Sequence, residues 1–232
     1  MLPIRDDQPR YSTPWVNYFL IGLNLVIFFF EFTLDPRSLE VLVRQFGVVP
    51  SHLELFLSGS PRYSLVAIVL PFFTSLFLHG SWMHVIGNMW FLYIFGDNVE
   101  DYLGHFKYLV FYLLTGVLAM GTHMVMNLHS TAPALGASGA IAGVLGAYFV
   151  LYPRARVLTW FFVFVLWVPA WVILGYWFVL NFLSGTATSL AVQGRGNMGG
   201  VAFWAHVGGF VSGALLVKVF GERQRRHPYA FQ

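Results

Sequence analysis

The chain has 232 residues, of which 57% are hydrophobic and 10% are charged, whereas a typical soluble domain has about 25% charged residues. Its formal net charge of +3 is too small to indicate a nucleic-acid-binding protein, and the lack of cysteine excludes disulfides and thiolate catalysis. Because the apolar residues come in long runs, the sequence predicts an all-α membrane protein that crosses the bilayer several times.

Six apolar segments are predicted to span the membrane. They cover residues 15–34, 71–99, 106–128, 138–152, 157–183 and 203–220. The first segment has no small-residue cleavage site, so we expect it to remain as a helix rather than to be removed as a signal peptide. The helical core of the second is expected from Trp82 onward, and Pro169 predicts a kink in the fifth.

The connecting segments differ in character. Residues 35–69 mix charged and apolar residues and predict short amphipathic helices at the membrane interface. Residues 184–200 are rich in Gly, Ser and Thr and predict a flexible loop. With no internal repeat evident, we expect a cytoplasmic segment over 1–14, one six-helix domain over 15–220 and a basic cytoplasmic tail over 221–232.

The distribution of basic residues predicts the orientation. With both termini in the cytoplasm, nine Lys and Arg residues fall on the inner side and four on the outer side, as the positive-inside rule expects. A minimal core without targeting extensions favours a prokaryotic plasma membrane, with an organellar membrane as the alternative.

This topology brings polar residues together at one end of the bundle. The second, fourth and sixth spans all run from outside to inside, so their N-terminal ends share the outer half of the membrane. Those ends carry His79, His84, Asn88, Ser138 and His206. Ionisable groups at membrane depth are costly unless they are satisfied, which makes them candidate functional groups.

Ser138 begins the fourth span within Gly136-Ala137-Ser138-Gly139. A helix over 138–152 is about 22 Å long, which is shorter than the roughly 30 Å hydrocarbon core. If its other end lies at the inner surface, Ser138 lies beneath the outer surface, beside unpaired backbone N–H groups and the positive end of the helix dipole. Such a place stabilises a developing oxyanion.

Small residues recur at helical spacing on two spans: Gly139, Gly143 and Gly146 on the fourth, and Ala205, Gly209 and Gly213 on the sixth. Such faces let two helices approach closely. Packing them together would bring His206 near Ser138, where its imidazole could accept the serine proton and activate the nucleophile.

His84 and Asn88 are four residues apart, so they point to one side of the second span, and both can donate hydrogen bonds to an oxyanion. No carboxylate is placed to act as a third catalytic group. The acidic residues of the second span belong to its inner end, and Glu31 ends the first span away from the polar clusters. The sequence therefore predicts a Ser–His dyad rather than a triad.

Four motifs stand in order along the chain: Phe77-Leu78-His79-Gly80-Ser81-Trp82-Met83-His84 with Asn88, Gly96 through Glu100 to Gly104, Gly136-Ala137-Ser138-Gly139, and Ala205-His206 with Gly209 and Gly213. In this order and on these spans they resemble the rhomboid intramembrane serine proteases over residues 15–220. The resemblance implies a six-helix core that cleaves substrate transmembrane helices near their outer ends.

The resemblance also implies roles for single residues. Ser138 looks like the nucleophile and His206 like the general base, while His84, Asn88 and the Ser138 backbone N–H resemble the oxyanion hole. The supporting residues are His79, Glu100, Gly136, Gly139, Gly143, Gly209 and Gly213. The loop at 184–202 and the fifth span resemble a mobile cap and a lateral gate for the substrate.

Three positions depart from the family pattern. Many rhomboids carry Trp-Arg in the first outer loop, where this chain has Pro61-Arg62-Tyr63. Some have an aromatic residue four positions after the serine, where this chain has Ala142, so the histidine ring must be held in another way. Tyr102 stands where an arginine often follows the acidic residue.

Two other functions remain open. One is a catalytically silent relative that binds transmembrane helices, and the other is a transporter with His79, His84 and His206 as an ion relay. The sequence shows neither the His-Glu-x-x-His of a metalloprotease nor the inverted repeats of many transporters. We expect no metal, cofactor or nucleic acid, and we expect the partners to be the lipid bilayer and single-pass transmembrane substrates.

Overall fold

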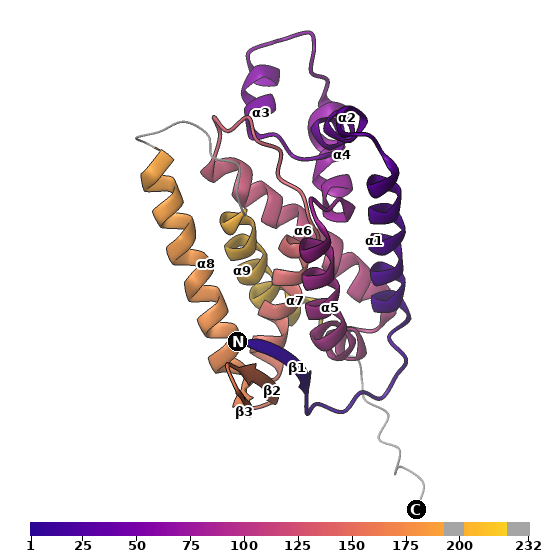
Figure 1. The fold of residues 1–232 in the computed structure, drawn as a ribbon, viewed down its shortest axis with the longest axis vertical. Coiled ribbons are helices and arrows are strands. Elements are labelled where there is room, and N and C mark those ends of the chain that lie inside the picture. Colours follow the sequence, from indigo (N-terminus) through magenta and orange to yellow (C-terminus); the bar gives the residue numbers. More distant parts are fainter. Residues whose placement is uncertain (193–201, 222–232) are drawn as a thin grey trace, which may run out of the picture.

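The computed structural model describes residues 1–192 and 202–221 of the chain, and it is mostly helical, which confirms the predicted class (Figure 1). The helix at its centre is α7 (Ser138–Leu151), which is buried from Gly139 to Tyr148. It packs against α5 (Trp82–Leu103), α6 (His105–Met126), α8 (Ala170–Val192) and α9 (Phe203–Phe220). Between Ser138 at its start and Tyr148, α7 carries only apolar side chains and glycines, and a helix of this kind can be buried all round.

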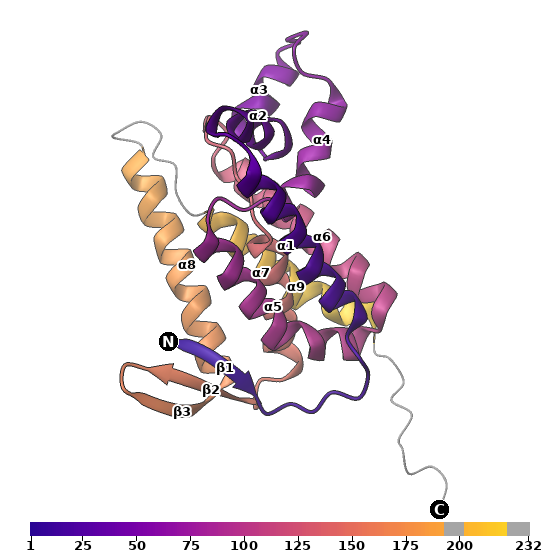
Figure 2. The ribbon, with the colours of Figure 1, turned by 45° about the vertical axis from the view of Figure 1, so that its right-hand side comes forward.

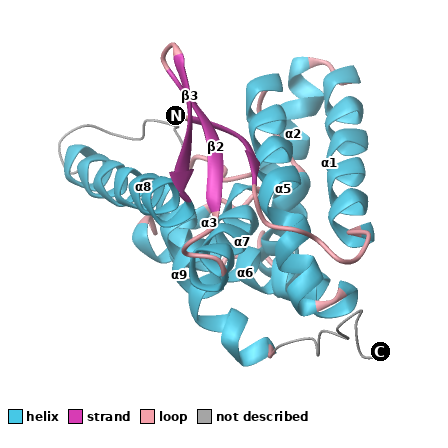
Figure 3. Ribbon diagram, turned by 90° about the horizontal axis from the view of Figure 1, so that it is seen from below, coloured by secondary structure: helices cyan, strands magenta, loops and turns pink. Residues whose placement is uncertain are grey.

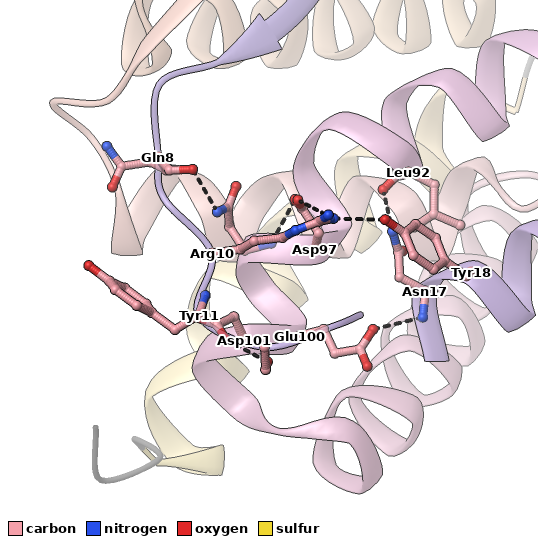
Figure 4. Close-up of polar contacts among 11 residues, drawn as sticks. Gln8, Arg10, Tyr11, Asn17, Tyr18, Leu92, Asp97, Glu100 and Asp101 are labelled. Carbon is pink, nitrogen blue, oxygen red and sulfur yellow. Dashed lines mark hydrogen bonds and ion pairs between the residues drawn. The ribbon is translucent and has the colours of Figure 1, made fainter. Parts of the chain in front are cut away.

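The outer helix α1 (Trp15–Thr33) packs on α5 and is capped by it. Pro14 precedes α1 and offers no side-chain cap. The carboxylate of Glu100 takes that role, because it accepts hydrogen bonds from the backbone N–H of Val16 at 3.0 Å and of Asn17 at 2.7 Å. His105 Nδ1 lies 2.5 Å from the same fully buried carboxylate. Glu100, near the C-terminal end of α5, therefore ties α5 to the start of α1 (Figure 4).

The segment between α1 and α5 folds as three short helices, α2 (Pro36–Phe46), α3 (Pro50–Leu57) and α4 (Leu65–Thr74). Asp35 caps α2 by accepting from the backbone N–H of Arg37 and Ser38. A 3₁₀ turn, η1 (Ser75–Phe77), follows α4, and the chain then bends by 78° into α5. His79 lies in this bend.

By length and composition, four helices of the described residues can cross a membrane: α1, α6, α8 and α9. The bent pair of α4 with η1 and α5 would make a fifth. With 14 residues, α7 is apolar but only about 21 Å long. The count of six spans therefore stays a prediction.

The predicted fifth span is wrong over its first half. Residues 156–169 form a hairpin of β2 (Arg156–Phe161) and β3 (Phe164–Pro169), and β1 (Leu2–Asp6) adds to β2 in the antiparallel order β1-β2-β3. Pro169 ends a strand instead of kinking a helix. The hairpin was missed because its residues are apolar on both faces, so the alternation that indicates a strand is absent.

The helix α8 begins directly after β3 and continues to Val192. The flexible loop predicted at 184–200 is therefore wrong up to residue 192, because helical hydrogen bonding continues through its small and hydroxyl residues. Thr186 and Thr188 satisfy their hydroxyl groups on carbonyl oxygens of the preceding helical turn. Residues 193–200 of that loop, and the tail from residue 222, lie outside the described residues.

We call the end of the bundle that holds β1, β2 and β3 the sheet end, and the opposite end, where α7 begins at Ser138, the site end. The N-terminal segment joins the sheet end through polar contacts (Figure 4). Arg10 Nη1 donates to Tyr18 Oη at 2.7 Å and lies 3.7 Å from Asp97 Oδ2. Burial raises the pKa of Asp6 to about 6, and Tyr148 Oη donates to its carboxylate at 2.5 Å.

Glycines set the distance between α7 and α9. A Cβ atom added at Gly209 would collide with the carbonyl of Gly139, and one added at Gly213 would collide with the carbonyl of Gly143. These two glycines of α9 therefore confirm the predicted close approach of the two helices. On α7 the Cβ position of Gly143 faces Thr115 of α6 instead, so the small residues of α7 serve two neighbours.

We expect Gly209→Val to lower the thermal unfolding temperature of the purified protein in detergent by several degrees or to prevent folding. Forcing side-chain volume into a packed interface typically costs about 1–3 kcal/mol. Gly22→Val on α1 is the matched control, because a Cβ at Gly22 meets nothing within 4 Å. Equal unfolding temperatures for the two variants would contradict the close helix contact.

Candidate active site

The site is built on the contact between α7 and α9. Ser138 is the first residue of α7, and its Oγ lies 2.8 Å from Nε2 of His206, which is on α9 and 8% exposed. The two residues meet because Gly209, one turn after His206, rests against the carbonyl of Gly139, one residue after Ser138. The predicted proximity of the serine and the histidine is therefore observed.

Sequence reasoning missed the second partner of His206. Its Nδ1 lies 2.6 Å from Oδ1 of Asn181, a buried residue on α8. The indole ring of Trp177, one turn earlier on α8, lies 5.5 Å from the imidazole at an interplanar angle of 36°. A carboxylate is the usual third group of a serine triad, whereas the structure supplies an amide at this position. These two α8 residues hold the ring that Ala142 is too small to support.

The two side chains predicted as oxyanion donors come from α5, and the structure places one of them, His84, against the turn that leads into Ser138. The backbone of Gly136 has φ 123°, and a Cβ there would come within 2.7 Å of the His84 ring, so only glycine fits this turn. That added Cβ would also lie 3.6 Å from Ser138 Oγ. The loop is fixed by the Gly136 N–H, which donates to the Ser75 carbonyl at 2.8 Å. His84 and Ser138 therefore flank the same glycine.

Asn88 is buried one turn further along α5, and its Nδ2 donates to Nε2 of His79 at 3.0 Å. An amide nitrogen carries two hydrogens, so the second remains available to another acceptor. The rings of His79 and His84 lie 5.1 Å apart, edge to face. His79 thus orients Asn88, which accords with the supporting role expected for it.

The placement predicted for Glu31 is wrong. Its buried carboxylate accepts from the backbone N–H of His79 at 3.1 Å and 3.3 Å, so it belongs to the polar cluster of the site end. The prediction failed because Glu31 was judged by its place on α1, whereas the bend between η1 and α5 brings His79 back to it. Glu31 reaches the site through His79 and Asn88 and is not a hydrogen-bond partner of His206.

No group of three or more His, Cys, Asp or Glu side chains within residues 1–192 and 202–221 is arranged to hold a metal ion. The chemistry that these residues support is nucleophilic. A hydroxyl faces an imidazole nitrogen, the other imidazole nitrogen is hydrogen-bonded, and the hydroxyl stands at a helix N-terminus.

The fold and the site define a class: a polytopic helical membrane protein with a hydrogen-bonded serine and histidine at the N-terminal end of its central helix. The family model described as Rhomboid domain matches residues 67–223. The chain therefore belongs to the rhomboid family. This match includes Ser138, His206, His84 and Asn88.

Known proteins support this membership. The chain is 31% identical over 228 residues to RHOMBOID-like protein 1 of Arabidopsis thaliana, an alignment that covers 89% of this chain and 53% of the relative. It is 31% identical over 161 residues to Rhomboid protein 1, mitochondrial, of Saccharomyces cerevisiae, an alignment that covers 66% of this chain and 43% of the relative. It is 43% identical over 75 residues to Rhomboid-like protein 11, chloroplastic, of Arabidopsis thaliana, an alignment that covers 32% of this chain and 26% of the relative.

The chain thus spans about half of the length of these relatives or less. Two of their names place them in mitochondria and chloroplasts, which conflicts with the predicted prokaryotic plasma membrane. That prediction rested on the lack of a targeting extension. The prediction that the chain is an integral membrane protein is supported by its apolar helices.

Proposed function

We propose that this chain is an intramembrane serine endopeptidase that cleaves transmembrane helices of other proteins. The observation that carries the proposal is the 2.8 Å contact between Ser138 Oγ and His206 Nε2 at the start of a buried apolar helix. A hydroxyl becomes a useful nucleophile when a base is within hydrogen-bond reach, and this pair meets that requirement.

The reaction follows from the positions of the atoms. Ser138 Oγ attacks the scissile carbonyl carbon while its proton passes to His206 Nε2, and the carbonyl oxygen becomes an oxyanion. The Ser138 N–H, the free Asn88 Nδ2 hydrogen and the His84 ring can donate to that oxygen. His206 then gives the proton to the leaving amine, and the C–N bond breaks to leave an acyl-enzyme. Water, deprotonated by His206, releases the acyl group and restores Ser138.

The substrates we propose are single-pass transmembrane proteins, entering from the lipid bilayer. The carbonyls of an intact helix are engaged in hydrogen bonds, so a substrate helix has to unwind locally before Ser138 can attack. With both termini of the enzyme in the cytoplasm, the cut falls near the outer face of the membrane. Helix-weakening residues close to that face are therefore expected in the substrates.

The test uses the purified full chain in liposomes with a model transmembrane substrate and a fluorophosphonate probe. Wild type should cleave the substrate and be labelled, whereas folded Ser138→Ala and His206→Ala should do neither, because each removes one half of the nucleophile–base pair. The matched controls are Ser212→Ala on α9 and His129→Ala on an exposed loop, which should keep both activities. A wild type that neither cleaves nor labels would contradict the proposal and favour a helix-binding function.

We further expect Asn88→Ala to lower kcat by about 10²–10³ with little change in KM, since loss of one oxyanion donor weakens binding of the transition state alone. Asn127→Ala at the end of α6 is the control substitution, and thermal unfolding checks that both variants fold. An unchanged kcat in folded Asn88→Ala would remove Asn88 from the oxyanion role.

A further inference from the structure

We propose that Asn181 is a positioning residue that holds His206 in the tautomer needed to accept the proton of Ser138, so that α8 controls the catalytic base. This inference rests on the proposed protease function. It adds a third side chain, from a third helix, to the predicted pair. The chain of contacts runs from Asn181 Oδ1 to His206 Nδ1 at 2.6 Å and from His206 Nε2 to Ser138 Oγ at 2.8 Å.

The orientation of the Asn181 amide is fixed by its other hydrogen bond. Its Nδ2 donates to the backbone carbonyl of Trp177 at 2.8 Å, a group that can only accept. The oxygen of the amide must therefore face His206. Because an amide oxygen is only an acceptor, Nδ1 of His206 has to carry the ring proton.

The consequence for catalysis falls on the opposite ring nitrogen. When a neutral imidazole carries its proton on Nδ1, Nε2 has a free lone pair, and here that lone pair faces the Ser138 hydroxyl. The other tautomer would set a lone pair against the Asn181 oxygen and an N–H against the serine. Orienting the histidine in this way is the task that a buried carboxylate performs in a serine triad.

Trp177 restrains the same ring from its face. It is four residues before Asn181, so both side chains project from one side of α8 toward α9. Asn181 sets the rotation of the ring within its plane, and Trp177 limits its tilt. A displacement of α8 would remove both restraints together, while Ser138 on α7 would stay in place.

The experiment compares Asn181→Leu, which keeps the branching at Cγ but has no acceptor, with Asn181→Asp, which keeps an acceptor for the Nδ1 proton. We expect Asn181→Leu to lower kcat and the rate of fluorophosphonate labelling by about 10–100-fold with little change in KM, which is less than the roughly 10²–10⁴-fold contribution of a general base because His206 itself remains. Asn181→Asp should restore a large part of the loss. Thr186→Val, five residues further along α8, is the control and should behave as wild type.

A spectroscopic measurement separates positioning from packing. Nitrogen NMR of ¹⁵N-histidine protein, assigned with His206→Ala, should show the Nδ1-protonated tautomer of His206 in wild type and its loss in Asn181→Leu. Suppose that wild type is labelled and that folded Asn181→Leu shows the same labelling rate and the same His206 tautomer. That result would overturn the role of Asn181 and leave the protease proposal standing. Absence of wild-type labelling would instead overturn the protease proposal.

A second inference concerns the sheet end and rests on independent observations. We infer that the hairpin of β2 and β3 is a membrane anchor that lies in the lipid interface. Its residues 160–167 read Trp-Phe-Phe-Val-Phe-Val-Leu-Trp, without a polar side chain, and all eight are exposed in the isolated chain. Phe162 and Val163 at the tip are 81% and 83% exposed. A continuous apolar surface of this kind indicates an interaction site.

The backbone at the tip points to the same conclusion. Phe162 has φ 53°, a conformation that bulky residues rarely adopt and that two-residue hairpin turns usually assign to Gly, Asn or Asp. The chain instead places Phe162 and Val163 in this turn. An apolar tip is therefore retained at a conformational cost, which a contact with lipid would explain.

The surroundings of the hairpin identify lipid as the partner. Figures 2 and 3 show the hairpin extending sideways from the helices at the base of α8. Its apolar surface continues into the exposed Trp171 at the start of α8, one of the helices apolar enough to span the membrane. The exposed Arg154 precedes the hairpin, the exposed Arg156 is its first residue, and the Arg5 guanidinium lies 5.7 Å from the Trp167 ring. Aromatic side chains flanked by cations suit the headgroup boundary.

The lack of cysteine allows a direct test with single nitroxide labels in proteoliposomes. A label at Val163→Cys should be more accessible to oxygen than to a water-soluble nickel chelate, as at the exposed Val26→Cys on the spanning helix α1. Pro9→Cys, at the same end of the molecule, is the aqueous control. Phe162→Cys provides a second position. Accessibility at both tip positions that matches Pro9→Cys would overturn the inference.

Discussion

The close approach of α7 and α9 is the constraint on which the site depends. Gly209 and Gly213 let α9 rest on the carbonyl oxygens of α7, and only at that separation does His206 reach Ser138 at 2.8 Å. Larger residues at these positions would force the two helices apart. The same glycines that pack the core of the bundle therefore set the geometry of the nucleophile and its base, so folding and chemistry share one contact.

The polar groups of the site end come from five helices, and each has a distinct physical task. Helix α7 supplies the hydroxyl and its free N–H groups, α9 the imidazole, α5 the amide and ring beside the serine, and α8 the restraints on His206. Glu31 on α1 secures the bend that carries His79. Because Asn181 and Trp177 both contact the imidazole of His206, a shift of α8 would change the orientation of that ring.

The sequence allowed Ser138 and His206 to be placed together, because topology fixes which helix ends meet and helical spacing fixes which residues share a side. It could not place Asn181, since a single amide within an apolar run has no periodic signal. Glu31 was misplaced because a bend of 78° after η1 cannot be read from composition. The hairpin was taken for part of a span because hydropathy alone does not separate an apolar strand from an apolar helix.

The central claim is that Ser138 is a nucleophile activated by His206 within the membrane protein. Peptide mapping by mass spectrometry, after fluorophosphonate treatment of the intact protein in liposomes, tests it most directly. We expect a single adduct, on the peptide that contains Ser138, with none on any other serine and none in His206→Ala. An adduct on a different serine, or equal labelling of Ser138 in folded His206→Ala, would contradict it.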